Sequence, residues 1–519
     1  MSFIDKFKNF RFIDDDRDIF AQSQKFASYL KQNNIKEIEI YLSSACDFCI
    51  AFFGAMIAGA VAYILPKPIF SGEMLSVRDE NFAEFLDVND IYELNLNEDS
   101  KFYLQTSGST GKSKNIKKSL KSMIVEGEYL AKIFGFSPEN IIFASVSHQH
   151  MFGLAYRIFL PMMIGSKAIA RELNYPEAIL ELDLNNHVLI TSPVLLKALV
   201  QSPRADEIKP ICGIVSAGSE LKSELREELN KLCNAKIIDI YGSTETGTIA
   251  QNLGDGLMLL EPVKGGLDER EALNVSSPWC EFFQSNDCAG IEGSRLILRG
   301  RIDRIIKLND KRISLENIEK KLFESGILSD CYCAVHPKFK RAVALLELNK
   351  SGLDKFRKFG KAGIVEQLKE ILKIEYKNSI RHFKIVESLP RNPQGKFSKD
   401  KFEEVLFRQI SPKWTRTKSD VWEYKFSCVM SVELDIFTHH FARLPLVPGF
   451  FQLDFIFALA RSVGVKFSDK TSVENLKFTK FVRPNDTLDV CFDVSDEKIN
   501  FELFCNGEKC SSGRIKFDI

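Results

Sequence analysis

The spacing of hydrophobic and polar residues predicts an α/β arrangement for the first part of this 519-residue chain. A helix at 19–33 and a strand at 37–42 are followed by an uncharged run of nineteen residues, 48–66. That run approaches the length that spans a bilayer, but glycines and alanines dilute it. It divides into a helix that ends near Gly59 and a strand at 61–65. We therefore expect a buried helix–strand pair rather than a membrane span.

From residue 140 onward, short apolar strands alternate with amphipathic helices. The pattern predicts strands at 188–191, 211–217 and 236–240, which alternate with helices at 193–200 and 221–233. This βαβαβ order is typical of a parallel sheet. In such sheets ligands bind at the carboxyl ends of the strands. The residues that follow these strands are therefore the first candidates for a binding site.

Two polar stretches occupy those strand ends. One is Ser216-Ala217-Gly218-Ser219-Glu220, and the other is Tyr241-Gly242-Ser243-Thr244-Glu245-Thr246-Gly247. The second combines an aromatic ring able to stack on a base, a hydroxyl able to bind a phosphate and a carboxylate able to hold Mg²⁺. A helix N-cap from Ser243 or Thr244 would explain one residue of the string but not the whole.

A loop rich in glycine and hydroxyl residues carries the strongest chemical signal. An apolar strand at 102–104 runs into Thr106-Ser107-Gly108-Ser109-Thr110-Gly111-Lys112-Ser113-Lys114-Asn115. Backbone N–H groups, hydroxyls and lysines are the donors that polyphosphate oxygens need. The loop is not a Walker loop, because that motif needs glycine at position 106, where this chain has Thr. A polar surface turn before a helix is the plain structural alternative.

Composition narrows the class of protein only modestly. Basic and acidic residues balance at 70 each, so the charge favours neither a nucleic-acid-binding nor a membrane-surface protein. The start of the chain, with Asp5, Lys6 and Lys8, lacks the pattern of a signal peptide, and twelve cysteines are scattered along the sequence. We therefore expect free thiols and a cytoplasmic location. Cys46 and Cys49 form a CxxC pair, but no second pair follows at zinc-site spacing.

Taken together, these motifs resemble those of the adenylate-forming superfamily, which includes acyl-CoA synthetases and carrier-protein acyl ligases. Thr106–Gly111 and Lys114 fit its phosphate loop, whereas Ser113 and Asn115 replace a Pro and a Gly of the family pattern. The resemblance implies a domain that uses ATP and Mg²⁺, with Glu245 as the metal ligand. It assigns nucleotide binding to Thr106, Ser107, Gly108, Ser109, Thr110, Gly111, Lys114, Gly218, Ser219, Glu220, Tyr241, Gly242, Thr244, Glu245, Asp287 and Arg301.

Further residues take roles by the same resemblance. His150 would line the carboxylate end of the acyl pocket, and the nearby His148 receives no role. Asp303 would be the hinge of a small C-terminal lid. Lys396, in a Pro-x-x-x-x-Gly-Lys loop that starts at Pro390, would stabilise the charge that develops when a carboxylate attacks the α-phosphorus. Asp310 stands where the family has a glycine that borders the thiol channel, so the route of the acceptor stays open.

Beyond residue 420 the pattern changes to alternating strands around one apolar helix at 450–463. The sequence before this helix, 440–449, resembles the motif of hot-dog dehydratases that act on β-hydroxyacyl carrier-protein thioesters. His440 and Asp454, fourteen positions apart, fit the acid–base pair of that family, while Ala442 replaces its first proline. A His removes the α-proton, and a carboxylic acid protonates the leaving hydroxyl. Asp in place of Glu resembles the branch that makes medium-chain unsaturated acids and the dehydratase-like proteins of aryl-polyene pathways.

The predicted fold class is α/β. An adenylate-forming enzyme fold, made of a large N-terminal α/β domain and a small α+β lid, is expected to precede an α+β hot-dog domain. The expected boundaries are 1–299 for the adenylation domain, 300–410 for the lid, 411–420 for a linker and 421–519 for the hot-dog domain.

The predicted function joins two reactions. The first is ATP-dependent activation of a fatty or aryl carboxylic acid as an acyl-adenylate, with transfer to the phosphopantetheine thiol of an acyl carrier protein. The second is dehydration of β-hydroxyacyl thioesters in fatty-acid or aryl-polyene biosynthesis. Besides the acid and the carrier, we expect a homodimer through the hot-dog domain, and neither nucleic-acid binding nor stable membrane insertion.

An alternative function uses the same motifs differently. The chain would then be an acyl- or aryl-CoA ligase whose hot-dog domain only dimerises or docks a carrier. The sequence leaves open which acid is activated, because the shape of the acyl pocket depends on tertiary structure. It also leaves open whether the acceptor is a carrier protein or CoA.

Overall fold

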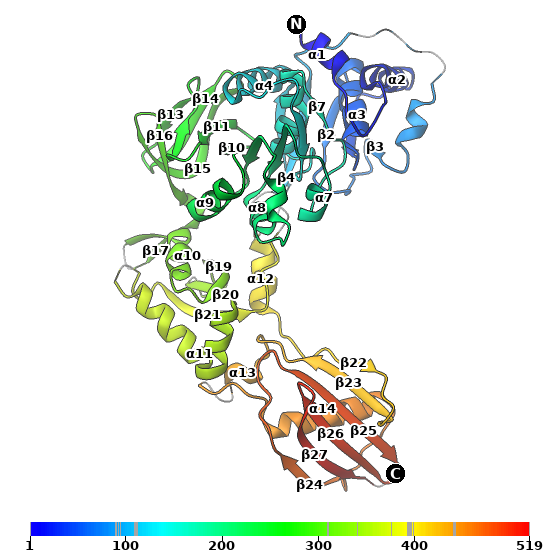
Figure 1. The fold of residues 1–519 in the computed structure, drawn as a ribbon, viewed down its shortest axis with the longest axis vertical. Coiled ribbons are helices and arrows are strands. Elements are labelled where there is room, and N and C mark those ends of the chain that lie inside the picture. The colour runs from blue at the N-terminus through cyan, green and yellow to red at the C-terminus, as the bar shows by residue number, and fades with distance from the viewer. Residues whose placement is uncertain are drawn as a thin grey trace. The chain divides into compact units, whose positions relative to one another are not determined.

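The computed structural model describes residues 2–88, 91, 93, 95–107, 113–308, 311–339, 341–374, 376–391, 397, 399–439 and 443–517. The chain forms two compact units: residues 1–302 with 391–396, and residues 303–390 with 397–519. Figure 1 labels many of the helices and strands of both units.

The N-terminal part of the first unit is built on a sheet with strand order β3-β1-β2-β4-β5. β1 pairs in parallel with β2 and β3, and β2 pairs in parallel with β4. β5 is antiparallel to β4, so the segment after the phosphate loop is a strand before it becomes a helix. The strands are β1 (Glu37–Tyr41), β2 (Val61–Ile64), β3 (Leu75–Arg78), β4 (Lys101–Ser107) and β5 (Ser113–Ser119).

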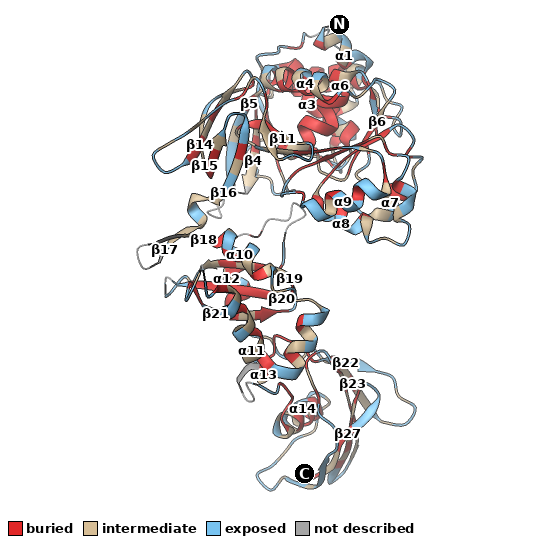
Figure 2. Cartoon of the chain, turned by 60° about the vertical axis from the view of Figure 1, so that its left-hand side comes forward, coloured by how far each residue is buried: buried red, intermediate tan, exposed pale blue. Residues whose placement is uncertain are grey.

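The uncharged run of the sequence forms a buried helix followed by a strand, as predicted. α3 (Ala45–Ala58) begins after Ser44, whose side chain caps the helix by accepting from the N–H of Asp47. It ends at Gly59, which takes the left-handed conformation with φ 69°. Every residue of α3 except Asp47 is buried, as Figure 2 shows by colour. In the part of the chain that the structure describes, no helix is both long and apolar enough to cross a membrane.

A second sheet of the first unit has the strand order β13-β14-β15-β16-β12-β11-β10-β9-β8-β6-β7. Its strands from β7 to β10 are parallel, which confirms the predicted βαβαβ pattern. From β10 to β13 the pairing is antiparallel. β10 extends to Ser243 instead of ending at residue 240, because Gly242 and Ser243 pair with β11.

Among the elements of this second sheet and its helices, β8, β9, β10, α8 and α9 lie close to the predicted ranges. The strands are β6 (Ile141–Ala144), β7 (Lys167–Ala168), β8 (His187–Thr191), β9 (Gly213–Ser216), β10 (Lys236–Ser243), β11 (Gly247–Asn252), β12 (Leu257–Leu259), β13 (Lys264–Leu267), β14 (Ala272–Ser277), β15 (Cys280–Glu292) and β16 (Arg295–Arg301). The other helices of the unit are α1 (Phe3–Asn9), α2 (Ile19–Gln32), α4 (Leu120–Phe134), α5 (Met151–Gly153), α6 (Leu160–Ile164), α7 (Pro176–Leu180), α8 (Pro193–Val200) and α9 (Ser223–Leu232).

The second unit begins with the lid segment. Its strands form a small hairpin, β17-β18, and a sheet of order β19-β20-β21. The elements are β17 (Ile305–Leu308), β18 (Lys311–Ser314), α10 (Leu315–Phe323), β19 (Leu328–Val335), β20 (Ala342–Leu348), α11 (Lys350–Leu372), β21 (Ile380–Val386) and α12 (Lys399–Phe407). α11 is interrupted at Gly360, where φ is 65°.

The C-terminal segment wraps an antiparallel sheet around one helix, in agreement with the predicted hot-dog fold. The strand order is β22-β23-β25-β26-β27-β24. The buried side chain of Gln452 on the helix donates to the carbonyl of Val447 and accepts from the Ser511 hydroxyl at 2.8 Å. The elements are β22 (Thr415–Thr417), β23 (Tyr424–Val429), α13 (Ile436–His439), α14 (Gly449–Ser462), β24 (Ser472–Phe478), β25 (Thr487–Ser495), β26 (Lys498–Cys505) and β27 (Glu508–Lys516).

Charged contacts connect the lid and hot-dog segments within the second unit. Glu433, whose side chain is 1% exposed, pairs with the Arg408 guanidinium and accepts from the backbone N–H of Glu387 at 2.7 Å. Arg357 of α11 pairs with Asp486 at 3.0 Å. Buried apolar residues of both segments also form one continuous cluster. The two segments therefore pack as one body.

Candidate active sites

Three predicted nucleotide-binding residues meet at the antiparallel part of the second sheet. The Tyr241 hydroxyl, at the end of β10, donates to the Asp287 carboxylate at 2.5 Å. Arg301, at the end of β16, donates to the other oxygen of that carboxylate at 3.3 Å and lies opposite Asp287 in the β15–β16 register. The side chains of Asp287 and Arg301 are 24% and 40% exposed. All three side chains are thus close together and open to a ligand.

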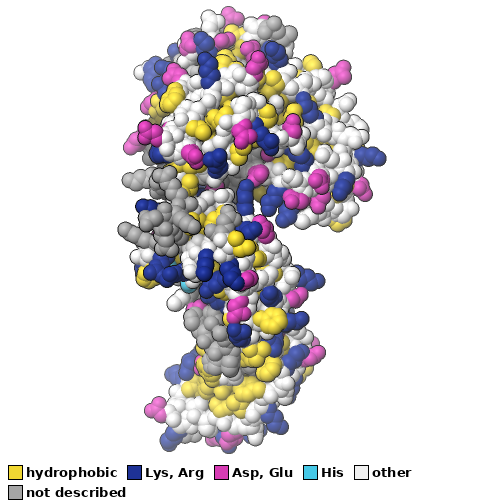
Figure 3. Space-filling model, turned by 90° about the vertical axis from the view of Figure 1, so that its left-hand side faces the viewer, with side chains coloured by type: hydrophobic (Ala, Val, Ile, Leu, Met, Phe, Trp, Pro, Cys, Tyr) yellow, Lys and Arg dark blue, Asp and Glu magenta, His cyan; other side chains and the backbone are white. Residues whose placement is uncertain are grey.

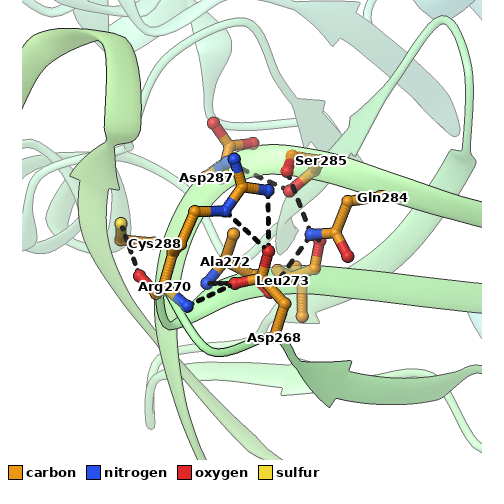
Figure 4. Close-up of polar contacts among 8 residues, drawn as sticks. All are labelled: Asp268, Arg270, Ala272, Leu273, Gln284, Ser285, Asp287 and Cys288. Atoms are coloured by element: carbon orange, nitrogen blue, oxygen red, sulfur yellow. Dashed lines mark hydrogen bonds and ion pairs between the residues drawn. The ribbon is translucent and has the colours of Figure 1, made fainter.

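Side-chain contacts within β15 and to the neighbouring β14 hold the strand segment that carries Asp287. The pairing of β14 with β15 shifts register between Ala272 and Asn274, which leaves backbone groups to be satisfied by side chains. The Gln284 amide donates to the carbonyls of Ala272, Leu273 and Ser285 at 3.2–3.3 Å, as Figure 4 shows. The Ser285 hydroxyl accepts from the backbone N–H of Asp287 at 3.0 Å. The carboxylate therefore projects from a braced position.

The Tyr-Gly-Ser-Thr-Glu stretch forms the turn of the β10–β11 hairpin rather than the start of a helix. Thr244 and Glu245 occupy this turn and are partly exposed. Thr246 is buried; its hydroxyl accepts from the Ser243 N–H at 3.0 Å and donates to the Gly247 carbonyl at 2.8 Å. A Cβ at position 242 would lie 2.1 Å from that carbonyl oxygen, which explains Gly242. The turn is therefore tightly closed.

Two buried charged residues that the sequence reasoning missed contact this turn. The Lys118 ammonium of β5 donates to the backbone carbonyl of Glu245 at 2.8 Å, and Glu126 of α4 accepts from the N–H of Thr248 at 2.7 Å. The sequence held a signal for both. Lys118 lies two residues after Ile116 and therefore on the same, inward face of its strand. Glu126 lies among the buried positions of an amphipathic helix.

Three more of the predicted nucleotide-binding residues, those expected by the family resemblance to lie along the adenine, follow β9. Gly218, Ser219 and Glu220 are exposed, and Gly218 has φ 98°. Their anchor is Asp239 of β10, whose buried carboxylate accepts from the N–H of Leu221 at 3.3 Å. Burial raises the pKa of Asp239 to about 6. The loop after β9 is thereby tied to the strand that carries Tyr241.

The two histidines of the acyl-pocket motif differ in burial. His148 is 1% exposed and lies 2.9 Å from the Leu42 carbonyl through Nε2. Burial lowers its pKa well below the ordinary value, so it is a neutral core residue. His150 is half-buried and precedes α5. A Cβ at Gly153 would lie 2.0 Å from the carbonyl oxygen of Ser147, so only glycine allows this tight loop.

The β4–β5 hairpin brings the two ends of the phosphate loop together. Thr106 faces Lys114 and Ser107 faces Ser113 in the strand register. Lys114 is exposed. Gly108, Ser109, Thr110 and Gly111 lie outside the described residues, as do Lys396, Asp310 and His440.

Other predicted residues fall at distinct places. Asp303 is exposed in a short 3₁₀ turn, Ile302–Arg304, and is the first residue of the second unit. Cys46 and Cys49 are buried on α3, and burial raises the pKa of both thiols. Such thiols are poor nucleophiles and poor metal ligands.

The second candidate site lies at the start of α14. The helix begins at Gly449, directly after Pro448, and a Cβ on Gly449 would lie 2.5 Å from the Phe478 ring. Asp454 stands exposed on this helix. Phe450, Phe478 and Phe481 are 51%, 48% and 60% exposed. Figure 3 shows hydrophobic side chains gathered on the surface of the hot-dog segment.

Comparison with known proteins defines the class of the first part. Residues 73–271 match the AMP-binding enzyme family. Acetyl-coenzyme A synthetase 2 of Candida albicans is 22% identical over 367 residues, which cover 58% of this chain and 53% of that protein. The chain thus spans about half the length of the curated relatives it matches.

Solved structures agree on the fold. ATP-bound MatB from Rhodopseudomonas palustris has a TM-score of 0.64 and 16% identity, with 75% of this chain and 92% of that chain covered. McyG A-PCP complexed with phenylalanyl-adenylate has a TM-score of 0.60 and 13% identity, with 75% and 89% covered. The adenylate-forming fold expected from the motifs is therefore present.

A C-terminal segment of the chain matches a second family. Residues 415–514 match the ApeI-like family, described as ApeI dehydratase. The chain accordingly combines an AMP-binding enzyme domain with an ApeI-like dehydratase domain, as the two sets of sequence motifs predicted.

Proposed function

We propose that the protein activates a carboxylic acid as an acyl-adenylate and passes the acyl group to a thiol. The observation that carries this proposal is the convergence of Tyr241, Asp287 and Arg301 beside the turn that holds Thr244 and Glu245. An aromatic ring, a carboxylate and a guanidinium suit the base, the ribose and the phosphate of a nucleotide. ATP with Mg²⁺ supplies the α-phosphorus and a pyrophosphate leaving group.

The residues of the chain divide the work by chemistry. Tyr241 stacks on the base, Asp287 accepts hydrogen bonds from the ribose hydroxyls, and Thr244 binds the α-phosphate. Glu245 holds the metal ion, for which a carboxylate oxygen is the preferred ligand type. Lys396 neutralises charge as the bond from the carboxylate oxygen to phosphorus forms and the bond to pyrophosphate breaks. The loop from Thr106 to Lys114 grips the remaining phosphates.

Thioester formation follows at the same centre. The thiol sulfur attacks the acyl carbonyl, and the thiol proton passes to solvent. The bond between the carbonyl carbon and the phosphate oxygen breaks, and AMP leaves with that electron pair. We propose the phosphopantetheine arm of an acyl carrier protein as the acceptor. Support comes from the ApeI-like domain on the same chain and from the likeness to a structure described as A-PCP. A fatty or aryl acid is the proposed substrate, with His150 at the carboxylate end of its pocket.

The ApeI-like domain is proposed to dehydrate β-hydroxyacyl thioesters. His440 removes the α-proton, and Asp454 gives a proton to the β-hydroxyl, which leaves as water while the double bond forms. A shared carrier would bring substrates to both centres, which suits fatty-acid or aryl-polyene biosynthesis in the cytoplasm. The exposed aromatic residues of this domain, Phe450, Phe478 and Phe481, support a homodimer through it.

Acid-dependent exchange between pyrophosphate and ATP tests the first half of the proposal. Wild-type protein is expected to catalyse exchange with at least one acid from a panel of fatty and aryl acids. Lys396→Ala is expected to lower the rate by about 10²–10³-fold, the usual loss when one preorganised charge-stabilising group is removed. Lys399→Ala, three residues along, is the control. An unchanged rate in Lys396→Ala would refute the role of Lys396.

The second half is tested with a carrier-bound β-hydroxyacyl thioester. Wild-type protein is expected to release water and form the enoyl thioester, and His440→Ala is expected not to. Intact dimers that dehydrate none of the thioesters tested would favour the alternative, in which the hot-dog domain only dimerises or docks the carrier.

A further inference from the structure

Two buried side chains of opposite charge lie against the Thr244–Thr246 turn, and the proposed chemistry uses neither. Lys118 is 7% exposed and Glu126 is 2% exposed. They come from β5 and α4, the two elements that directly follow the phosphate loop. Taking two charges out of water costs several kcal/mol for each ion. Burial of Lys118 and Glu126 beside the turn must therefore be offset by a structural or functional role.

Lys118 holds one flank of the turn. Its ammonium donates to the backbone carbonyl of Glu245 at 2.8 Å. Burial lowers its pKa, while the negative charges of Glu126 and Glu245 favour the protonated form. A hydrogen bond from a charged donor is roughly twice as strong as a neutral one. The hydrogen bond from Lys118 thus fixes the backbone of Glu245, the proposed metal ligand.

Glu126 holds the other flank. Its carboxylate accepts from the N–H of Thr248 at 2.7 Å and packs so closely on Gly247 that a Cβ there would lie 2.5 Å from Oε2. Gly247 has φ 68°, a conformation that glycine adopts at little cost. The Thr248 hydroxyl lies 2.8 Å from the buried Tyr156 hydroxyl. The first residues of β11 are thereby fixed in direction as well as position.

Stability alone does not account for this arrangement. Buried charged side chains are weak evidence of stabilisation, because well-packed apolar side chains of similar volume are often as stable. What charged groups add is direction, since each bonds one particular backbone atom. One bond ends on the turn, at Glu245, and the other on the first residues of β11 that directly follow it, at Thr248; both start from the segment that leaves the phosphate loop. Lys118 and Glu126, here called the clamp, thus link the phosphate-loop segment to the Thr244–Thr246 turn, two segments that must bind one ligand.

We propose that Lys118 and Glu126 are positioning residues that hold the Thr244–Glu245 turn in register with the phosphate loop, so that one Mg²⁺–nucleotide complex meets both. The inference rests on the proposed adenylation. It predicts that loss of the clamp weakens the use of Mg²⁺–ATP and leaves the use of the carboxylic acid unchanged.

The test compares Lys118→Met, Glu126→Gln and Lys118→Arg with a matched control. Lys236 also donates from Nζ to a backbone carbonyl at 2.8 Å, that of Phe134, but at the far end of β10. Lys236→Met therefore removes the same kind of bond away from the turn. Two quantities are measured: the Mg²⁺ and acid dependence of pyrophosphate exchange, and the rise in melting temperature on adding Mg²⁺–ATP without acid.

In Lys118→Met we expect the Mg²⁺ concentration for half-maximal exchange to rise about tenfold, the scale of one charge-assisted hydrogen bond. The KM for the acid should stay unchanged, and the melting-temperature rise with Mg²⁺–ATP should shrink. Lys118→Arg should restore most of both. Glu126→Gln keeps an acceptor for Thr248 and should show a smaller shift, about threefold.

Two results would overturn the inference. In the first, Lys118→Met shows the same Mg²⁺ dependence and the same stabilisation by nucleotide as wild type. In the second, Lys236→Met shows the weaker Mg²⁺ use and the smaller melting-temperature rise that are expected of Lys118→Met. Should Lys118→Met yield no folded protein, Glu126→Gln decides by the same comparison. A wild type that shows no exchange with any acid refutes the proposed adenylation instead. In that case the stabilisation by Mg²⁺–ATP still tests the clamp.

Discussion

The two candidate reaction centres differ in how much of their surroundings a single chain supplies. In the first unit, Asp287 is already paired with Tyr241 and Arg301 and braced by its own strand. In the hot-dog segment, Asp454 stands exposed one helical turn after the half-exposed ring of Phe450 on α14. A preorganised carboxylate indicates a site completed within the chain. An exposed carboxylate beside apolar surface indicates a site that something else must cover.

The largest expected effect is on the dehydration rate, and it comes from removing Asp454, the proposed acid of the hot-dog site, while the adenylation site is left intact. Asp454→Ala should lower dehydration by about 10²–10⁴-fold, the range that a positioned general acid contributes. Pyrophosphate exchange should remain at the wild-type rate. The measurement is product formation from a carrier-bound β-hydroxyacyl thioester in parallel with exchange. Asp469→Ala, an exposed carboxylate elsewhere in the same segment, is the control. Equal dehydration by Asp454→Ala and wild type would exclude Asp454 as the acid.

The next effect concerns stability and also treats the two units differently. The side chain of Glu433 is 1% exposed, and the contacts described above are those with the Arg408 guanidinium and the backbone N–H of Glu387. Arg408→Ala should remove the first of these and leave the second. Breaking a buried pair in this way costs about 3–5 kcal/mol. We expect the second unit to melt about 10 °C lower, since each kcal/mol is worth roughly 2–4 °C in a unit of this size. The first unit should melt unchanged.

The control for that prediction is a geometrically similar pair in the first unit. Arg204 also makes two bonds to one carboxylate, that of Glu207, but both side chains are nearly half exposed. Exposed pairs contribute about 0–1 kcal/mol, so Arg204→Ala should have little effect in calorimetry. Similar losses in both variants would mean that burial of Glu433 is not the cause.

A third prediction tests whether a second copy covers the hot-dog site. Phe481 is 60% exposed, and Phe481→Asp should weaken self-association by about 10–100-fold, the scale of one buried aromatic side chain. Dehydration should fall with the dimer fraction, whereas exchange should persist. Sedimentation velocity measures the association. Phe282→Asp, at a 70% exposed phenylalanine of the first unit, is the control and should leave the dimer intact.

Part of the first site could be expected because Tyr241 lies at the end of a strand that periodicity predicts. Asp287 was assigned to the same nucleotide site only by the resemblance of its motif to the family, and the structure brings the two side chains into contact on one sheet. Lys118 was missed because β5 was not predicted, and Glu126, on α4, was missed because no local rule says which backbone group a buried charged side chain will reach. The pairing of Arg408 with Glu433 is likewise tertiary, since it joins segments whose sequences give no register between them.

The smallest expected effect is a pH dependence confined to the first unit. The pKa of Asp239 rises from 3.8 to about 6, chiefly because burial disfavours the charged form. Between these values the folded protein holds a proton that the unfolded chain releases. Ionisation of Asp239 therefore lowers the free energy of unfolding as the pH rises through about 6. Below pH 4 this penalty is absent, and above pH 7 it is fully present.

Asp239→Asn keeps an acceptor for the Leu221 N–H and removes the charge, so it should relieve the penalty. We expect the variant to be more stable than wild type at pH 7.5 by roughly 2 kcal/mol, with the gain shrinking toward zero near pH 4. Denaturant unfolding of the first unit at several pH values measures the difference. A gain that is constant with pH would mean that packing rather than ionisation is responsible. If the gain shrinks as the pH falls, the adenine-side loop after β9 is anchored by a carboxylate that the fold keeps charged at a cost.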